Sequence, residues 1–508
     1  MANRTKNQDR LNFAGDYSID SAEIISYQIG DGGPGVGSEP VRMDIKNIIA
    51  TIELQENIFN HTMVGKIQVY DTQDVRTILP LTGLEKLNLA FSTPGMTGPR
   101  FLSSEYKSHP FHIYRVETVA TENTATAHQQ AYDIFFCSRE SYFNNMHKVS
   151  KAYNGPIELA VEDIFTNRKY LSSKKDIFIE KTKFPCKQVI PNMKPFTAID
   201  MLCSKAVSEK YMNAGYLFYE TYRGYHFRSI ESLLAMGGAG RRPAKWKYQM
   251  QQQNIRHHTG GKEIMKDMHG VMSWSLSDPI NTLENLNEGA YANTLIEHDM
   301  FNKIVNITEF NYETNWDKHY HTEMVDNNTK LPRAKFDDTG KKLSEKFDQR
   351  VFLKSSTSAV HTQVGNDGVT VNAIASIPSR FTTQKIVSQR KLLEEGILTL
   401  MVPGLSVLNA GDIINFDMPV MTPLAHNQKQ QSNPYWGGRY LIYNIKHSIS
   451  KSSGEYTMQI KAFKESVSTA YPKESDEWSH VGFSTVHDID NIDKQVIDDA
   501  GISDKFGV

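Results

Sequence analysis

Cysteines, long apolar runs and catalytic signature motifs are scarce or absent in this sequence of 508 residues. Its three cysteines, Cys137, Cys186 and Cys203, are odd in number and lack a Cys-x-x-Cys spacing, which argues against a disulfide framework and a zinc ribbon. No stretch approaches the ~18 apolar residues that a membrane helix needs. The first residues have no apolar core behind their charges, so no secretory signal is expected. These absences fit a soluble protein of a reducing cytoplasm that acts where it is made or leaves by a route other than secretion.

Charge and motifs exclude several further classes of protein. The formal net charge of -2 at pH 7 gives no global attraction to nucleic acid or to an acidic membrane. The motifs HExxH, GxSxG and GxxxxGKS/T are missing, so zinc-protease, α/β-hydrolase and P-loop functions have no support. The glycine-rich GDGGPGVG at 30–37 lacks the Lys-Ser/Thr of a phosphate loop and is expected to be a flexible loop. No catalytic or cofactor-binding residue is therefore predicted.

Two histidine clusters are the candidates for metal binding. In HYHTE, residues His319, His321 and Glu323 would point to one face of a strand, as a metal site requires. No fourth ligand is evident, so an exposed polar strand face is the favoured interpretation and no metal is expected. His257 and His258 in RHHTGG are adjacent and point apart, which indicates a loop.

One basic segment could bind nucleic acid. GRRPAKWKYQ at 240–249 mixes cations with aromatic rings, a combination that can hold a phosphate backbone and stack a base. The residues concerned are Arg241, Arg242, Lys245, Trp246, Lys247 and Tyr248. At this length a solvated linker is the commoner cause, and a linker is expected.

A strand pattern occurs twice in the chain. Residues 111–140 (FHIYRVETVATENTATAHQQAYDIFFCSRE) and 439–466 (RYLIYNIKHSISKSSGEYTMQIKAFKES) both contain an Ile-Tyr-x-Ile/Val strand and then a second alternating strand that begins near a tyrosine. Upstream of each lies an alternating strand that a proline ends, LNLAFSTP at 87–94 and IINFDMP at 413–419. The repeated order predicts two copies of one small β-domain, although short alternating hairpins also resemble one another by chance.

Length and periodicity predict how the copies are separated. A chain of this length should form about three or four domains. Helical spacing after Pro156 and Pro195 predicts two amphipathic helices, and an aromatic hairpin should turn at Gly224. A helical stretch is expected around 287–301, followed by a polar region at 325–350. The predicted organisation is a flexible N-terminus (1–15), a first β-domain (16–140), a helical connecting domain (141–212), a second β-domain (213–234 with 396–466), an inserted mixed region (235–395) and a tail (467–508).

The tail is acidic and polar, with one weak helical pattern. Its Ile489, Ile492, Val496 and Ile497 would form an apolar stripe suited to docking.

An ordered set of segments resembles the central baseplate hub proteins of contractile-tailed bacteriophages, the T-even-like tail hub family. The resemblance covers about residues 16–466 and rests on KPFTAIDMLCSKA, NAGYLFYETYRGYHFRSIESLL, EGAYANTLIEHDMFNK, PGLSVLNAGDIINF and GGRYLIYNIKHSI in that order. It implies an α+β, mainly β fold: two tube-protein-like antiparallel β-barrels, the second split by an insertion, and a mixed helical domain. The segment 325–385 and the tail after 467 depart from the shorter family members.

The resemblance also implies a function without catalysis. A hub would act as a homotrimer that joins the six-fold tail tube to a three-fold spike and forms part of the DNA conduit. Its partners would be a trimeric spike protein, tail tube or tube-initiator proteins and other baseplate proteins, with transient contact to passing DNA and no stable membrane association. It would be assembled in the host cytoplasm and reside in the virion tail. Two alternatives remain: a cell-wall-degrading tail enzyme, and the hub portion of a type VI secretion-like spike, which usually continues into β-helix repeats.

Overall fold

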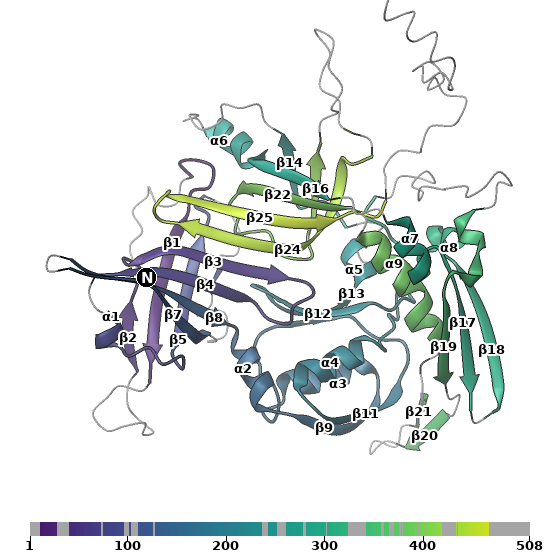
Figure 1. Cartoon of the computed structure of the whole chain (residues 1–508). Helices are drawn as coiled ribbons and strands as arrows, with labels where there is room; N and C mark the ends of the chain where they lie inside the picture. The colour runs from purple at the N-terminus through teal and green to yellow at the C-terminus, as the bar shows by residue number, and fades with distance from the viewer. Residues whose placement is uncertain are drawn as a thin grey trace, which may run out of the picture. The chain divides into compact units, whose positions relative to one another are not determined.

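The protein is described by a computed structural model (Figure 1). The structure describes residues 11–466 except 28–39, 73–74, 96–100, 103–109, 125–126, 236–241, 251–260, 278–280, 301, 324–341, 357–359, 365–369, 375–376, 378, 395, 419–432 and 434. The chain is mainly β, with 46% strand and 22% helix, and its sheets are largely antiparallel, as expected. Among the described helices, none has the length and apolar character needed to cross a membrane.

The first set of strands forms one half of a fifteen-stranded sheet. Its neighbours follow the order β2-β1-β5-β7-β8-β4-β3, and β6 pairs with β5. The elements are β1 (Ser18–Ser26), β2 (Val41–Asp44), β3 (Ile49–Asn57), β4 (Val64–Asp71), α1 (Val75–Ile78), β5 (Lys86–Ser92), β6 (Phe101–Leu102), β7 (Phe111–Thr124) and β8 (Ala127–Cys137). Inward positions recur every second residue, which places Ile52, Leu54, Ile67 and Ile134 in the core.

The second set of strands completes the same sheet. Its pairing runs β15-β14-β23-β24-β25-β22-β16. The elements are β14 (Trp246–Met250), α6 (Gly261–Met268), β15 (Gly270–Val271), β16 (Ser273–Ser277), β22 (Ile397–Pro403), β23 (Ile413–Asp417), β24 (Gly438–Ser450) and β25 (Glu455–Phe463). One hydrophobic core runs beneath both sets of strands, and it contains Ile113, Ile442 and Ile445.

The two sets repeat the same pairing order, in agreement with the repeated order of strands in the sequence. β5, β7 and β8 are paired as β23, β24 and β25 are, and β4 lies beside β8 as β22 lies beside β25. Both long hairpins also carry a register shift at the same place, the tyrosine of the Ile-Tyr motif: Tyr114 in β7 and Tyr443 in β24. A shared β-bulge is a specific feature of backbone geometry, so it marks these strands as equivalent. One pairing differs, because β14 runs parallel to β23 whereas β1 runs antiparallel to β5.

Two separate closed barrels are not seen in the described strand pairing, which forms one continuous sheet. In each set, however, the two strands at opposite ends of the pairing order are consecutive in the chain and are joined by a short segment. In the first set, β2 pairs with β1 and β3 pairs with β4, with residues 45–48 between them. In the second, β15 pairs with β14 and β16 pairs with β22, with Met272 between them.

The connecting domain packs two helices against small sheets. It contains α2 (Arg139–Met146), β9 (Val149–Gly155), α3 (Ile157–Thr166), β10 (Ile177–Ile179), β11 (Cys186–Met193), α4 (Pro195–Cys203), β12 (Tyr216–Thr221), β13 (Gly224–Ser229) and α5 (Ile230–Leu234). Both predicted helices are confirmed: Pro156 is the N-cap of α3, and Pro195 begins α4. Their buried faces share one core with the aromatic side chains of β12 and β13.

Three expectations about the second half of the chain are wrong. The hairpin within 213–234 pairs with β10 rather than with the strands of 396–466, because most of its buried aromatic rings lie in the connecting-domain core, although Tyr219 packs with Ile413 and Leu441 of the second set. Conversely, β14 and β16 come from the expected insertion and pair with β23 and β22. The helix expected at 287–301 is not found: α7 (Thr282–Glu288) stops at Gly289, whose φ of +73° is left-handed, and most of the segment forms β17 (Ala292–Asp299).

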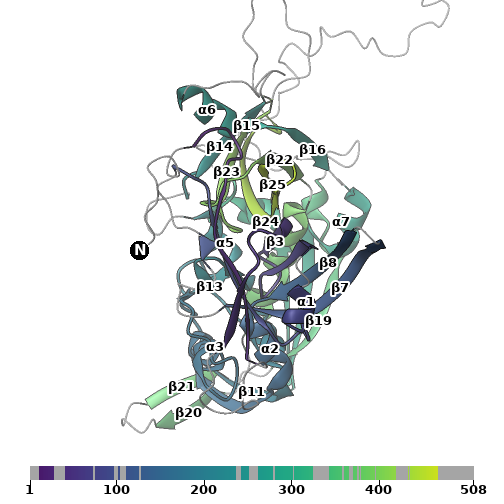
Figure 2. The same cartoon turned by 90° about the vertical axis from the view of Figure 1, so that its left-hand side faces the viewer.

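The remaining inserted elements lie beside the connecting domain. They are β18 (Ile304–Asn311), α8 (Tyr312–Asn315), β19 (Val351–Ser356), β20 (Val360–Val364), β21 (Thr370–Ile374) and α9 (Lys385–Leu393). β17 pairs with β18 and β19, while β21 pairs with β11, and Figure 2 shows β20 and β21 beside that strand.

Candidate functional site

The feature that joins the two strand sets is the pairing of β24 with β3, called the internal joint below. Seven residues of β24, Asn444–Ser450, lie antiparallel to Thr51–Asn57 of β3. The Gln55 side-chain amide donates to Asn444 Oδ1 at 3.0 Å, and Lys446 Nζ lies 3.1 Å from Glu53 Oε2. The first set therefore supplies a strand to the second by edge-to-edge addition, which is a general mode of protein association.

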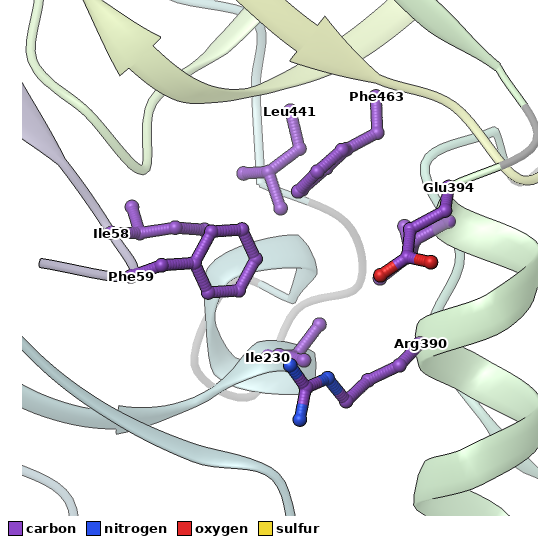
Figure 3. Close-up of a pocket in the computed structure, with 8 residues that line it drawn as sticks. Ile58, Phe59, Ile230, Arg390, Glu394, Leu441 and Phe463 are labelled. Atoms are coloured by element: carbon purple, nitrogen blue, oxygen red, sulfur yellow. The ribbon is translucent and has the colours of Figure 1, made fainter.

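Side chains that follow β3 fill a pocket at the end of the internal joint (Figure 3). The Ile58 amide donates to the Tyr443 carbonyl at 3.0 Å, at the bulge of β24. The Phe59 ring lies 6.2 Å from that of Tyr443 and 6.1 Å from that of Phe463. A cavity of about 10 Å³ remains there, lined by Ile58, Phe59, Ile230, Arg390, Leu393, Glu394, Leu441 and Phe463. The residues beyond the strand thus lock the joint by apolar packing.

A buried carboxyl group connects the joint to two neighbouring segments. Glu56 has no exposed surface and accepts hydrogen bonds from the Ala410 amide at 3.2 Å and the Tyr222 amide at 3.3 Å. Ala410 precedes β23, and Tyr222 lies in the turn between β12 and β13. Burial raises the pKa of Glu56 to about 8, although the two amide donors favour its charged form.

We expect Glu56 to make stability depend on pH. In the unfolded chain its pKa returns to about 4.3. Folded protein therefore binds the extra proton between about pH 4 and pH 8, and stability falls as pH rises through this window. Glu56→Gln should remove this contribution, so wild type should lose stability relative to the variant, by on the order of a few kcal/mol, as pH rises to about 8.5. Thermal melts across pH measure it, with Glu53→Gln as the control; parallel curves for wild type and Glu56→Gln would contradict the assignment.

A second buried charge cluster fixes the first strand set to the connecting domain. Lys175 Nζ lies 2.9 Å from Glu140 Oε2 and 2.5 Å from Glu220 Oε1, and both carboxylates are fully buried. Glu220 also accepts from the Ser138 hydroxyl at 2.5 Å and the Met63 amide at 2.9 Å. Burial opposes the charge of Lys175, yet the two carboxylates outweigh it and raise the pKa of this lysine. For Glu220, burial is the largest effect and raises the pKa of its carboxyl group.

The HYHTE segment does not form the expected strand face. His319, His321 and Glu323 follow a 3-10 turn, and the first two are directed at different partners. His319 Nδ1 lies 3.0 Å from Glu231 Oε1 and also contacts Lys385 Nζ, and burial lowers the pKa of both His319 and Lys385. In the part of the chain that the structure describes, no group of three or more His, Cys, Asp and Glu could hold a metal ion. That no metal binds at His319 or His321 stays a prediction.

His321 and Glu323 serve packing and backbone contacts instead. The His321 ring stacks on Trp316 at 3.6 Å between centroids, and its Nε2 lies 2.9 Å from the Trp316 carbonyl oxygen. Glu323 Oε1 accepts from the Arg439 amide and lies 3.5 Å from Lys464 Nζ. These contacts attach the segment to the ends of β24 and β25.

The described part of the basic segment, residues 242–249, is not a solvated linker: its last four residues belong to β14, and Arg242 and Lys245 are paired within the fold. Arg242 Nη2 and Lys245 Nζ lie 2.9 and 2.7 Å from the two oxygens of Asp412. Lys247 Nζ lies 3.4 Å from Asp417 Oδ2, and the Trp246 ring stacks on His269. Arg242, Lys245 and Lys247 are thus each paired with a carboxylate within the fold, which weakens the nucleic-acid interpretation.

Several candidates that the sequence singles out lie outside the described residues. These are the glycine-rich loop at 30–37, Arg241, the pair His257 and His258, and the apolar stripe of Ile489, Ile492, Val496 and Ile497.

Sequence reasoning missed the buried charges. Glu56 follows Ile52 and Leu54 at the inward positions of β3, and Glu220 lies in the aromatic strand YLFYET. The sequence signal was a glutamate at a position where the alternation of the strand predicts an inward-facing side chain.

Comparisons with known proteins give structural likeness only. No protein-family model matches the sequence, and no curated protein matches it. Among solved structures, the chain is similar to a tail protein from Neisseria meningitidis MC58 (7% identity, TM-score 0.47, covering 89% of this chain and 97% of that one). It is also similar to the 43 kDa tail protein of prophage MuSo2 from Shewanella oneidensis (9%, 0.44, covering 87% and 98%).

A third similar structure is the E. coli c3393 protein (12%, 0.39, covering 84% and 76%), a component of the type VI secretion system described as similar to the T4 bacteriophage tail proteins gp27 and gp5. The structural neighbours are thus phage tail proteins and proteins related to type VI secretion, at low sequence identity.

Proposed function

We propose that this chain is a structural virion protein, the central hub of a phage tail baseplate, and that it has no catalytic role. The observation that carries the proposal is the repeat of one strand order and one bulge in two sets that are joined edge to edge. The ordered sequence segments that resemble tail hubs support it independently. In this role the protein joins a six-fold tail tube to a three-fold spike and forms part of the DNA conduit.

The duplication supplies a physical route to such symmetry matching. A homotrimer whose subunits each carry two similar β-domains presents six similar units around a three-fold axis. Head-to-tail contacts in a closed ring are heterologous and self-limiting. The β-domains we assign are residues 16–140, and residues 246–277 together with 396–466; the helical domain 141–234 and the rest of the insertion complete the subunit. Closure of each strand set into a tube-like barrel belongs to this proposal and would leave few free sheet edges.

The proposed partners follow from this position. They are a separate trimeric spike protein, tail tube or tube-initiator proteins and other baseplate proteins. Contact with passing DNA is transient. A conduit that neutralised many phosphates would bind the DNA tightly and slow its release. The protein requires no cofactor, is assembled in the host cytoplasm and resides in the virion.

Light scattering tests the assembly state. The chain, alone or with its spike partner, should give a homotrimer of about three times the 57.7 kDa chain mass, ~173 kDa. A stable dimer, a hexamer or a monomer under both conditions would leave the proposed symmetry matching without a mechanism.

The competing class is a cell-wall-degrading tail enzyme. We expect the purified chain to leave a peptidoglycan gel intact in zymography. Clearing of the gel by the isolated chain would count directly against a purely structural hub.

A further inference from the structure

The two strand sets differ in burial where the internal joint lies. β7 corresponds to β24, yet within the described residues Arg115–Val119 of β7 pairs with β8 alone, whereas Asn444–Ser450 of β24 pairs on both sides. β16 corresponds to β3, yet it pairs with β22 alone. Each chain therefore contains one internal joint, between β24 and β3. The corresponding edges of β7 and β16 are paired with no further strand among the described residues.

Equivalent side chains are more exposed at these open edges. Ile445 on β24 is fully buried, whereas the corresponding Val116 on β7 is half-buried. Tyr443 is half-buried, while its counterpart Tyr114 is 47% exposed. On the other edge Ile52 and Leu54 of β3 are buried, and the corresponding Trp274 and Leu276 of β16 are half-buried. Side chains that the internal joint buries on β24 and β3 are thus more exposed at the corresponding positions of β7 and β16.

A groove beside Tyr114 corresponds to the pocket that Ile58 and Phe59 fill. Cys137 of β8 corresponds to Phe463 of β25. Cys137 pairs with His112 and Phe463 pairs with Leu441, and each of these partners directly precedes an Ile-Tyr motif. At Phe463 a cavity of about 10 Å³ remains, whereas about 550 Å³ is open beside Tyr114. The groove is lined by Val64, Tyr114, Cys137, Ser141, Tyr142, Asn145 and Met146.

We propose that β16 of a second copy of this chain adds to the open edge of β7, and that this second copy covers the groove beside Tyr114. This inference rests on the proposed trimeric hub and names the surface through which its subunits join. The occupant follows from the internal joint, where the equivalent strand and the residues after it occupy the equivalent edge and pocket. Three repeats of the contact close a ring in which every joint, within or between chains, has the same form.

The internal joint also fixes the register between subunits. Lys446 lies opposite Gln55 in the internal joint. Counting through the matched pairs, Glu117 takes the place of Lys446, and Ser277 takes the place of Gln55. Glu117 of one subunit should therefore lie opposite Ser277 of the next.

Cysteine cross-linking tests this register. The double variant Glu117→Cys/Ser277→Cys, oxidised after assembly alone or with the spike, should give disulfide-linked species up to the trimer on a denaturing gel. Gln55→Cys/Lys446→Cys is the matched control, because the same register there lies within one chain and should leave the monomer band. Each single-cysteine variant should give no linked trimer, since the native Cys137, Cys186 and Cys203 are buried.

Thiol labelling tests the groove separately. Met146 is 68% exposed in the single chain, so Met146→Cys should react readily with a maleimide before assembly and at least about tenfold more slowly afterwards, because the second copy covers it. Leu159→Cys on α3, at a residue 57% exposed, is the control and should react equally in both states. A trimer without cross-links and with unprotected Met146→Cys would overturn this inference and leave the hub proposal standing. A chain that stays monomeric with and without spike would overturn both.

Discussion

Replacing Gly65 with leucine should prevent stable folding of the first strand set. Gly65 lies opposite Phe136 across β4 and β8, and a β-carbon at Gly65 would overlap that aromatic ring and lie 2.6 Å from the Glu53 carbonyl oxygen. The equivalent pair in the second set is Leu398 opposite Ala462, so the two copies have exchanged the large and the small side chain. Overpacking a filled core costs about 1–3 kcal/mol or more. We expect Gly65→Leu to lower the free energy of unfolding by at least ~3 kcal/mol in denaturant titrations.

The second copy supplies the control for this prediction. Phe136→Ala alone should cost about 3–5 kcal/mol, because it opens a cavity. The double variant Gly65→Leu/Phe136→Ala reproduces the pair found in the second set and should lose less stability than the sum of the two single losses, because removal of the ring relieves one of the two close contacts at Gly65 and leaves the other, with the Glu53 carbonyl oxygen. Additive losses in the double-mutant cycle would show that the two positions are not coupled and would refute the exchange.

Removing the largely buried cation at Lys175 should be equally severe. Lys175→Met leaves Glu140 and Glu220 close together without a counter-charge, and both are fully buried. Breaking a buried ion pair from one side costs about 3–5 kcal/mol. We expect a loss of that size at neutral pH, measured by chemical unfolding, and a smaller loss at acid pH, where the carboxyl groups can be protonated.

Lys174 provides the matched control for Lys175. Its side chain is exposed, so Lys174→Met should change stability by less than about 0.5 kcal/mol. If Lys175→Met behaves like Lys174→Met, the buried cluster does not stabilise the fold.

The elements that the sequence predicted correctly are those whose periodicity and capping residues lie within one short segment. The alternating strands and the proline-started helices α3 and α4 were recognisable because period and capping are written in neighbouring residues. The shared bulge at Tyr114 and Tyr443 explains why the Ile-Tyr motif stood out in both copies. Gly65 interrupted the pattern of β4 because its space is filled from the neighbouring strand by Phe136.

Partner choice between distant segments could not be predicted in the same way. Whether the hairpin around Gly224 joined the connecting domain or the second strand set depended on which core received its aromatic rings. β17 was mistaken for a helix because its apolar residues fit either period over a short run, and pairing with β18 and β19 decided the outcome. The contacts of Glu56 and Lys175 join segments far apart in sequence, so their partners were not readable from spacing.

Electron-microscopy class averages of the assembled protein, viewed along its axis, test the central claim most directly. The account predicts a ring of six similar lobes with true three-fold symmetry, in which first and second strand sets alternate around the bore. Labelling the first set, for example through Tyr27→Cys at an exposed residue, should mark every second lobe. A ring of three lobes, or six lobes that are all labelled, would contradict the proposal that one duplicated chain matches six-fold to three-fold symmetry.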